Sequence, residues 1–173
     1  MVKEVEFHRE VLDNGLTVLF EKRGGPVVTT ASSVKFGAQF ESAKIKGISH
    51  FIEHLVFKGT KKRNVKEIAE AVESKGGIIN AFTAEEITSY WNKMPAKYFK
   101  LSADVGRDLV LNPVFEKTAM ERERGVILEE IKMYHDNPSS HVLEKVKEML
   151  YGNPFGMSIA GTHESVAGLT RKR

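Results

Sequence analysis

Residues 50–54 read His-Phe-Ile-Glu-His, which places two histidines and a glutamate within five positions. An α-helix turns about 100° per residue, so His50, Glu53 and His54 would share one sector of a helical surface. Zinc accepts imidazole and carboxylate ligands, and a catalytic zinc site combines three protein ligands with a fourth position for water. The spacing therefore predicts His50 and His54 as metal ligands and Glu53 as a general base. The alternative is a solvated helix face that happens to carry two histidines.

The residues around this pattern have the periodicity of a helix that buries its opposite side. Apolar residues recur three and four positions apart after Gly47, at Ile48, Phe51, Ile52, Leu55 and Val56. Lys58-Gly59-Thr60 then ends the helix. Such a helix would pack its apolar side on the protein and present the imidazoles and Glu53 to a ligand.

Strands and further helices are expected on both sides of this helix. The predicted strands span residues 5–12, 16–22, 27–40, 78–83 and 87–94, the third ending at Gly37 or soon after. Asp13-Asn14-Gly15 joins the first two as a hairpin. The other predicted helices run from Asn64, which forms a capping box with Glu67, to 75–77, and then over 95–111, 116–134 and 141–150. We therefore expect an α+β domain in which helices cover one face of a largely antiparallel sheet.

Composition limits the classes of function. The chain has 173 residues with an apolar fraction of 41%, enough for one domain with a hydrophobic core. Its formal charge is only +3, and its 26 basic residues are interleaved with 23 acidic ones, which argues against a nucleic-acid partner. It has no cysteine, which fits a reducing compartment. No apolar stretch approaches the roughly 18 residues that cross a membrane, so we expect a cytoplasmic protein without a membrane partner.

Several motifs together resemble the insulinase/pitrilysin family, especially its processing-peptidase branch. His-x-x-Glu-His is the inverted zincin motif. The segments that resemble the family's other signatures are Phe57-Lys58-Gly59-Thr60, Gly76-Gly77-x-x-Asn80-Ala81-x-Thr83 and residues 121–131. The resemblance extends over essentially all 173 residues. It implies a zinc peptidase of the inverted-zincin type.

The resemblance also implies a third metal ligand, a glutamate about 76 positions after the second histidine, which selects Glu130. Glu129 is the nearest rival, but Glu130 and Glu123 are seven residues apart and share a helix face, whereas Glu129 is turned about 100° away. Glu123 matches a second family glutamate near the metal, with a catalytic role in orienting a ligand or tuning the field at the water. The alternative for Glu123 is a surface carboxylate paired with Lys or Arg.

Substrate contact is expected at Asn80 and Ala81. The resemblance puts both at the edge of strand 78–83, where an extended peptide could add through main-chain hydrogen bonds. The alternative is that Gly76-Gly77 is an ordinary helix C-cap and Asn80 an ordinary loop residue. The other histidines (His8, His135, His141 and His163) have no partner at ligand spacing and are expected at the surface. Tyr90 and Trp91 are expected to pack a strand against helices.

The sequence thus predicts a zinc endopeptidase acting on short or unfolded polypeptides by metal-activated water. Two alternatives are a non-catalytic peptide-binding or structural subunit, and a scaffold with an incidental motif that binds no metal. Active family members resemble a clamshell whose two halves are related domains, and 173 residues are too few for one complete half. Leu169-Thr170 looks like a helix N-cap three residues before the end. We therefore expect residues 1–173 to be one domain, incomplete at its C-terminus, that needs a second homologous domain or subunit or associates with itself.

Overall fold

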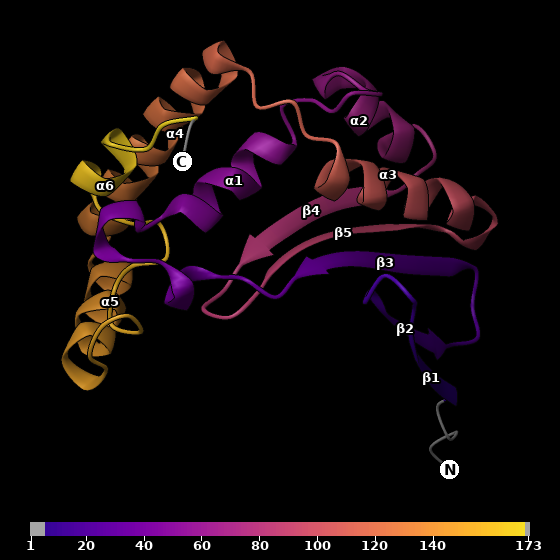
Figure 1. Ribbon diagram of the computed structural model, residues 1–173, viewed down its shortest axis with the longest axis horizontal. Coiled ribbons are helices and arrows are strands. Elements are labelled where there is room, and N and C mark those ends of the chain that lie inside the picture. The colour runs from indigo at the N-terminus through magenta and orange to yellow at the C-terminus, as the bar shows by residue number, and fades with distance from the viewer. Residues whose placement is uncertain (1–5, 172–173) are drawn as a thin grey trace.

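The computed structural model describes residues 6–171, and Figure 1 shows how their elements are arranged. The strands are β1 (Glu6–Val11), β2 (Thr17–Lys22), β3 (Val27–Val34), β4 (Ile78–Thr83) and β5 (Thr88–Pro95). The helices are α1 (Ile48–Val56), α2 (Val65–Glu73), α3 (Phe99–Leu111), α4 (Lys117–Asp136), α5 (Pro138–Leu150) and α6 (His163–Ala167). Short 3-10 turns lie at Ala38–Phe40, Ala43–Ile45 and Ala96–Tyr98. Within this part of the chain, none of the helices has the length and apolar character needed to span a membrane.

The central sheet is antiparallel, with strand order β3-β5-β4. Helices α2 and α3 cover one face of it (Figure 1). Tyr90 and Met94 of β5 point into the core on this side and meet Val72, Val105 and Leu109. The predicted α+β class, with helices on one face of an antiparallel sheet, is confirmed. Tyr90 packs against the helices as expected, but the alternation of a strand directs the next residue, Trp91, to the opposite face.

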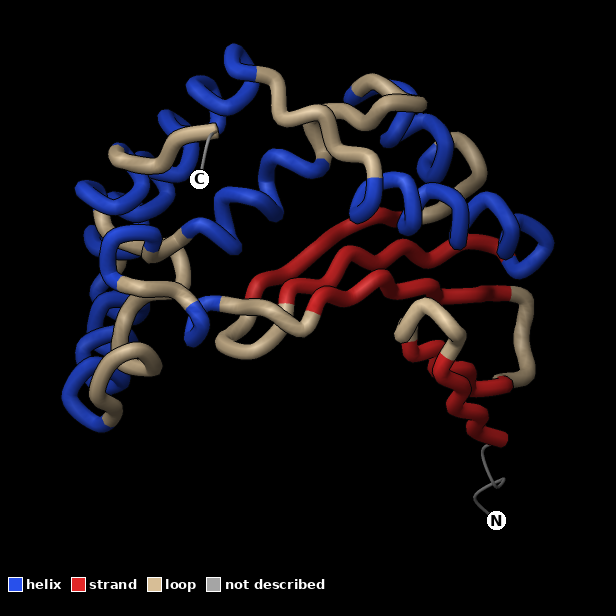
Figure 2. The backbone as a smooth tube through the Cα atoms, viewed as in Figure 1, coloured by secondary structure: helices blue, strands red, loops and turns tan. Residues whose placement is uncertain are grey.

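The predicted hairpin forms, but as a separate two-stranded sheet. Strands β1 and β2 pair from Glu6↔Lys22 to Val11↔Thr17 around the expected Asp13-Asn14-Gly15 turn. Figure 2 shows the hairpin projecting away from the central sheet, on the side opposite α3. All residues of both strands are exposed, including the apolar ones. The hairpin therefore contributes no side chain to either hydrophobic cluster within residues 6–171.

Three predicted boundaries are wrong. Helix α5, expected from residue 141, begins at Pro138, because the Asn137 side chain caps it and proline suits the first helical position. The other two are wrong because tertiary contacts override local propensity. Strand β3 ends at Val34, because the segment after it turns to bond the β4–β5 connection, where Ala38 N–H donates to the Ala84 carbonyl at 3.0 Å. Pro95 does not start a helix: it ends β5 opposite Val27, and α3 begins only at Phe99. Proline is tolerated there because a strand end needs no further N–H for the ladder.

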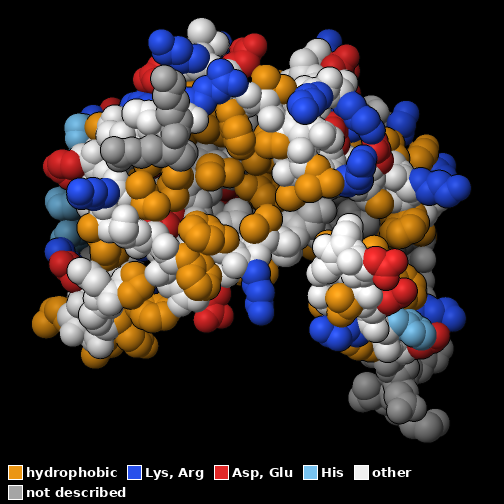
Figure 3. Space-filling model, viewed as in Figure 1, with side chains coloured by type: hydrophobic (Ala, Val, Ile, Leu, Met, Phe, Trp, Pro, Cys, Tyr) orange, Lys and Arg blue, Asp and Glu red, His pale blue; other side chains and the backbone are white. Residues whose placement is uncertain are grey.

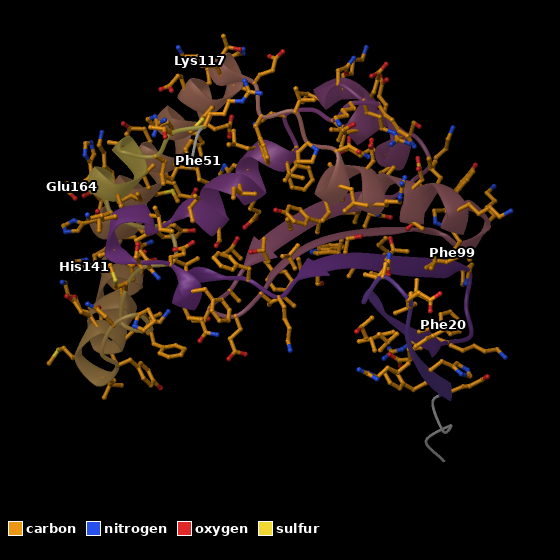
Figure 4. All side chains as sticks on the ribbon, viewed as in Figure 1. Phe20, Phe51, Phe99, Lys117, His141 and Glu164 are labelled. Atoms are coloured by element: carbon orange, nitrogen blue, oxygen red, sulfur yellow. The ribbon has the colours of Figure 1, made fainter. Side chains whose placement is uncertain are left out.

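The C-terminal segment contains a helix that the sequence did not predict. Thr162 and Ser165 form the capping box of α6, a serine replacing the usual Glu or Gln at the third position. The predicted N-cap at Leu169-Thr170 would start a helix mostly at residues 172–173, which lie outside the described range. Helix α6 packs with α1 and α4 in a second core that contains Phe51, Ile127 and Val166. Figure 4 shows Phe51 between these helices.

Candidate metal centre

Helix α1 carries the predicted motif and lies between α4 and the edge of the central sheet (Figure 1). Its apolar side is buried through Phe51, Leu55 and Val56, as the periodicity predicted, whereas Ile52, which the same pattern placed on the buried side, is 38% exposed. His50, Glu53 and His54 are half-buried on the other side. The helix thus presents all three polar side chains toward α4 and β4, while its back forms part of the core.

A buried acid caps the start of α1. Glu41 accepts hydrogen bonds from the backbone N–H groups of Gly47 at 2.8 Å and Ser49 at 2.7 Å. Lys46 Nζ lies 3.8 Å from Glu41 and donates to the Ala38 carbonyl at 2.7 Å. Burial lowers the pKa of Lys46, and the Glu41 carboxylate opposes that shift. Because the first N–H groups of a helix have no intrahelical acceptor, this carboxylate fixes where α1 begins.

The C-terminal segment supports the same end of α1. Gly47 has a φ of 89°, and a Cβ there would lie 2.4 Å from the Ala160 carbonyl oxygen, so only glycine fits. Ser165 Oγ donates to the Lys46 carbonyl at 2.7 Å. Residues more than one hundred positions after α1 therefore hold its N-terminus in place.

The segment after α1 is attached to α3 and to the connection that follows it. Lys61 N–H donates to the Asn112 carbonyl at 3.0 Å, and Val114 N–H donates to the Gly59 carbonyl at 3.1 Å. Thr60 Oγ1 donates to the buried Asp108 carboxylate at 2.6 Å. Helix α1 is thus fixed at both ends, which fixes the direction of its polar face.

Glu130 of α4 faces this polar surface. Its Oε2 lies 3.8 Å from His50 Nε2 and 3.6 Å from His54 Nε2. One donor atom from each of the three residues lies within 4.8 Å of the others, and they form the single such group of three among residues 6–171. Donors about 2.1 Å from a tetrahedral ion are about 3.4 Å apart, so the separations of 3.6 and 3.8 Å are near those that a zinc ion would require. Glu129 points elsewhere, with its side chain 71% exposed and 2.6 Å from Lys132 Nζ.

Further side chains orient the three donors. Glu123 Oε2 lies 3.3 Å from His54 Nδ1, and Lys58 Nζ lies 2.8 Å from the other Glu123 oxygen. With Nδ1 facing a carboxylate, His54 directs Nε2 toward Glu130. Tyr134 donates its hydroxyl to Glu130 Oε1 at 3.0 Å. Burial and the Glu130 carboxylate raise the pKa of Tyr134, which keeps this hydroxyl a donor.

His50 is oriented by burial rather than by a hydrogen bond. Its Nδ1 is buried and has no hydrogen-bond partner in the part of the chain that the structure describes. Burial lowers the pKa of His50, and the neighbouring Glu130 carboxylate opposes that shift. The neutral imidazole that burial favours is the form that binds a metal.

Glu53 is held from the sheet. Thr83, the last residue of β4, donates its Oγ1 hydrogen to Glu53 Oε2 at 2.5 Å. The carboxylate therefore has a fixed place beside the three donors without joining their group. This arrangement places three donor atoms that could hold a metal ion next to a carboxylate that could act as a base, the combination that hydrolysis by activated water would use.

An open cleft of about 600 Å³ leads to these residues. Besides the three donors, Glu53 and Tyr134, its lining comes from Ala81, Phe82 and Thr83 of β4, four residues of α5, and Gly156 and residues 158–160. Strand β4 is an edge of the central sheet, as predicted. Ala81 lines the cleft, whereas Asn80 does not. Asn80 Oδ1 instead accepts a hydrogen bond from the Ala81 N–H at 2.8 Å. The Asn80 side chain therefore satisfies a backbone donor that lies at the free edge of β4.

Sequence reasoning missed three residues that touch the site. Lys58 and Tyr134 each lie four positions after a predicted ligand, one helical turn away, and this spacing could have identified them. Thr83 ends the motif Gly76-Gly77-x-x-Asn80-Ala81-x-Thr83, but the sequence pattern alone indicates no role for it. Of the other histidines, His8, His135 and His163 are exposed, as expected, and His141 is half-buried. The rings of His135 and His141 lie 4.4 Å apart at the α4–α5 junction.

Comparisons with known proteins place this geometry in context. Residues 17–163 match the sequence profile described as Insulinase (Peptidase family M16). An uncharacterized zinc protease of Bacillus subtilis is 36% identical over 163 residues, 92% of this chain and 39% of that protein. The beta subunit of the mitochondrial-processing peptidase of Rattus norvegicus is 33% identical over 162 residues, 93% of this chain and 33% of that protein.

A comparison with solved structures agrees with these sequence matches. The crystal structure of a protease from Helicobacter pylori matches with a TM-score of 0.92 and 25% identity, over 98% of this chain and 41% of that one. The chain therefore spans about two fifths or less of the length of these relatives. The expectation of zinc agrees with the name of the Bacillus relative, a zinc protease. The extent of the profile match shows that this chain belongs to the insulinase family, peptidase family M16.

Proposed function

We propose that this chain carries the zinc site of a metalloendopeptidase, with His50, His54 and Glu130 as ligands and Glu53 as the general base. The observation that carries this proposal is the convergence of three donor atoms within 4.8 Å beside an anchored carboxylate. The names of its relatives, among them zinc proteases and a processing peptidase subunit, support the same reaction class. Zinc bound there would polarise the scissile carbonyl and make water more acidic.

The chain's own residues would carry the proton transfers. Glu53 would take a proton from the attacking water and deliver it to the departing amine. Glu123 and Lys58 would keep His54 in the ring orientation that directs Nε2 to the metal. Tyr134 would restrain Glu130 in the same way.

We infer that the substrate is an extended segment of polypeptide that adds to the edge of β4. The Ala81 N–H lies at this edge and donates to the side chain of Asn80, which a peptide carbonyl could displace. Main-chain pairing would suit short or unfolded polypeptides, because it does not depend on side-chain identity. A cytoplasmic location and a single domain over residues 1–173 remain predictions from the sequence.

The proposal is tested by metal content and by one isosteric variant. The purified chain should bind about one zinc, and Glu130→Ala should weaken binding sharply while Glu129→Ala should not. Glu53→Gln should keep zinc and the fold and lower the hydrolysis rate by about 10²–10⁴-fold or more. Zinc analysis and a quenched-peptide assay, run with any partner that completes the cleft, measure both.

Two outcomes would contradict the assignment. Loss of zinc from Glu53→Gln would make Glu53 a ligand rather than a base. If the chain binds zinc and peptide but does not hydrolyse the peptide when the partner is present, the alternative is supported, namely a peptide-binding subunit without catalytic activity.

A further inference from the structure

Thr83 connects the strand that borders the cleft to the proposed general base. Its hydroxyl donates to Glu53 Oε2 at 2.5 Å, and both side chains are half-buried. Glu53 belongs to α1 and Thr83 ends β4, thirty positions later. This hydrogen bond therefore joins helix α1, which carries the proposed metal ligands, to the edge of the sheet.

This bond engages only one oxygen of the Glu53 carboxylate. Across residues 6–171, Glu53 Oε1 has no hydrogen bond or ion pair. A hydroxyl carries one hydrogen, so Thr83 donates to only one of the two carboxylate oxygens. One oxygen is held in place while the other stays available for proton transfer.

The backbone of Thr83 is itself fixed from outside the strand. Gln39 N–H donates to the Glu85 carbonyl at 2.8 Å, and Ala84 N–H donates to the Ile87 carbonyl at 2.8 Å. Gly37 allows this approach, because a Cβ on it would lie 2.3 Å from the Ala84 carbonyl oxygen. The Thr83 hydroxyl is thus presented by a connection that has little freedom to move.

Thr83 also faces the peptide-binding edge. Ala84 and Ile87 form a hydrogen-bonded pair, so the alternation of an antiparallel ladder turns the backbone groups of Ala81 and Thr83 away from β5. An added peptide would pair with these groups. Its carbonyls would then lie next to the residue whose side chain holds Glu53.

We propose that Thr83 is a positioning residue that fixes Glu53 relative to a peptide bound along β4. This inference rests on the proposed peptidase function and adds a residue to it. A displacement of about 1 Å in a catalytic group can cost about 10²-fold in rate, and a hydroxyl bonded to a charged carboxylate is among the stronger hydrogen bonds. The role is one of orientation, since Thr83 contributes no donor to the metal group.

The test compares Thr83→Val, which is isosteric and lacks the hydroxyl, with Thr83→Ser, which restores it. In the zinc-loaded chain with its partner, Thr83→Val should lower kcat about 10–100-fold. KM and zinc affinity should stay within about threefold, because neither depends on this hydroxyl. Thr83→Ser should recover most of the rate. Thr29→Val, an exposed threonine on β3, is the matched control and should behave as the parent.

A second measurement requires neither metal nor activity. Urea unfolding of the zinc-free chain, of Thr83→Val, of Glu53→Ala and of the double variant forms a double-mutant cycle. The decreases in unfolding midpoint caused by the two single substitutions should add up to more than the decrease in the double variant, because each single substitution already removes the same hydrogen bond. Unchanged kcat in Thr83→Val, or equal losses in the Val and Ser variants, would overturn the proposal while leaving the peptidase function intact.

The two proposals can therefore fail separately. If the parent with its partner hydrolyses no peptide, the peptidase proposal fails. The double-mutant cycle is then the measurement that tests the Thr83–Glu53 hydrogen bond. Additive midpoints would then overturn the Thr83–Glu53 contact as well. Non-additive midpoints would support it.

Discussion

Adjacent glutamates on one helix have unlike environments in this protein. Glu130 faces two imidazoles and a tyrosine hydroxyl, whereas Glu129, turned by about 100°, bonds an exposed lysine. Glu123 shares the inward face, and it is buried between His54 and Lys58. Each carboxylate thus takes its role from the groups around it and not from its position in the sequence alone.

At this scale we predict that Glu123→Gln weakens zinc binding by about 10–100-fold, the usual effect of losing an outer hydrogen-bond partner of a ligand. The amide would no longer hold His54 through a charged acceptor, and Lys58 would lose its counter-ion. Competition with a chromophoric chelator measures the affinity. Glu129→Gln, on the solvent side of the same helix, is the control and should bind zinc as the parent does. Equal affinities for the two variants would assign Glu123 to the surface.

At the scale of elements, the direction of α1 depends on contacts at both of its ends. Glu41 and Ser165 of α6 hold the first turn, and the Thr60–Asp108 contact holds the segment that follows. Asp108 also accepts hydrogen bonds from Arg63 at 2.7 Å and Asn112 at 3.0 Å. This buried carboxylate therefore joins the segment after α1 to α3.

We predict that this junction makes the fold sensitive to acid. Burial tends to raise the pKa of Asp108, but hydrogen bonds from Thr60, Asn112 and Arg63 outweigh it and lower the pKa below its ordinary value of 3.8. A carboxyl whose pKa is lowered by folding stabilises the fold above its unfolded value, and that stability is lost as pH falls through the folded value. Stability from this group should be complete above about pH 5 and decline below pH 4.

Asp108→Asn should lower the free energy of unfolding by about 1–3 kcal/mol at pH 7, because buried donors lose a charged acceptor. Its stability should also fall less steeply than that of the parent between pH 5 and pH 3. Urea unfolding across this range measures both effects. Asp13→Asn, at the exposed hairpin turn, should keep the acid sensitivity of the parent, and a parallel pH dependence in Asp108→Asn would contradict the assignment.

At the scale of the whole molecule, α5 and the hairpin project from the same side of the sheet and leave a hollow between them (Figure 3). Apolar side chains on α5 are widely exposed, with Met149 at 85% and Leu143 and Leu150 at 71%. Exposed apolar surface of this extent favours association. The chain also spans about two fifths or less of the length of its relatives, which supports the proposal that a second domain or subunit completes the cleft.

We therefore predict that the isolated chain self-associates or requires a partner, and that it cleaves peptides weakly or not at all alone while retaining zinc. Water exclusion and clamping of substrate depend on closure of the cleft. Light scattering and a quenched-peptide assay, with and without the candidate partner, measure these properties. Met149→Lys with Leu150→Lys should reduce association, and Lys145→Gln on the same helix should not. A monodisperse monomer with full activity would contradict this prediction.

Local spacing along the chain was enough to predict the features that depend on neighbours within one or two helical turns. The His50, Glu53 and His54 face, the Asn64–Glu67 capping box and the hairpin all follow from local spacing, because helical and strand periods fix which residues share a face. Glu130 was chosen only with the help of a family resemblance, since no local pattern relates residues 76 positions apart.

The contacts between distant segments could not be predicted in this way, because they depend on how the whole chain packs. The bond from Thr83 to Glu53, the buried Glu41 cap and the support of α1 by Ser165 join residues that are close in space because helices and strands pack on a shared core. The same packing ended β3 early and delayed α3 to Phe99. Local propensity contributes less than about 1 kcal/mol per residue, so it yields wherever close packing and buried hydrogen bonds favour another conformation.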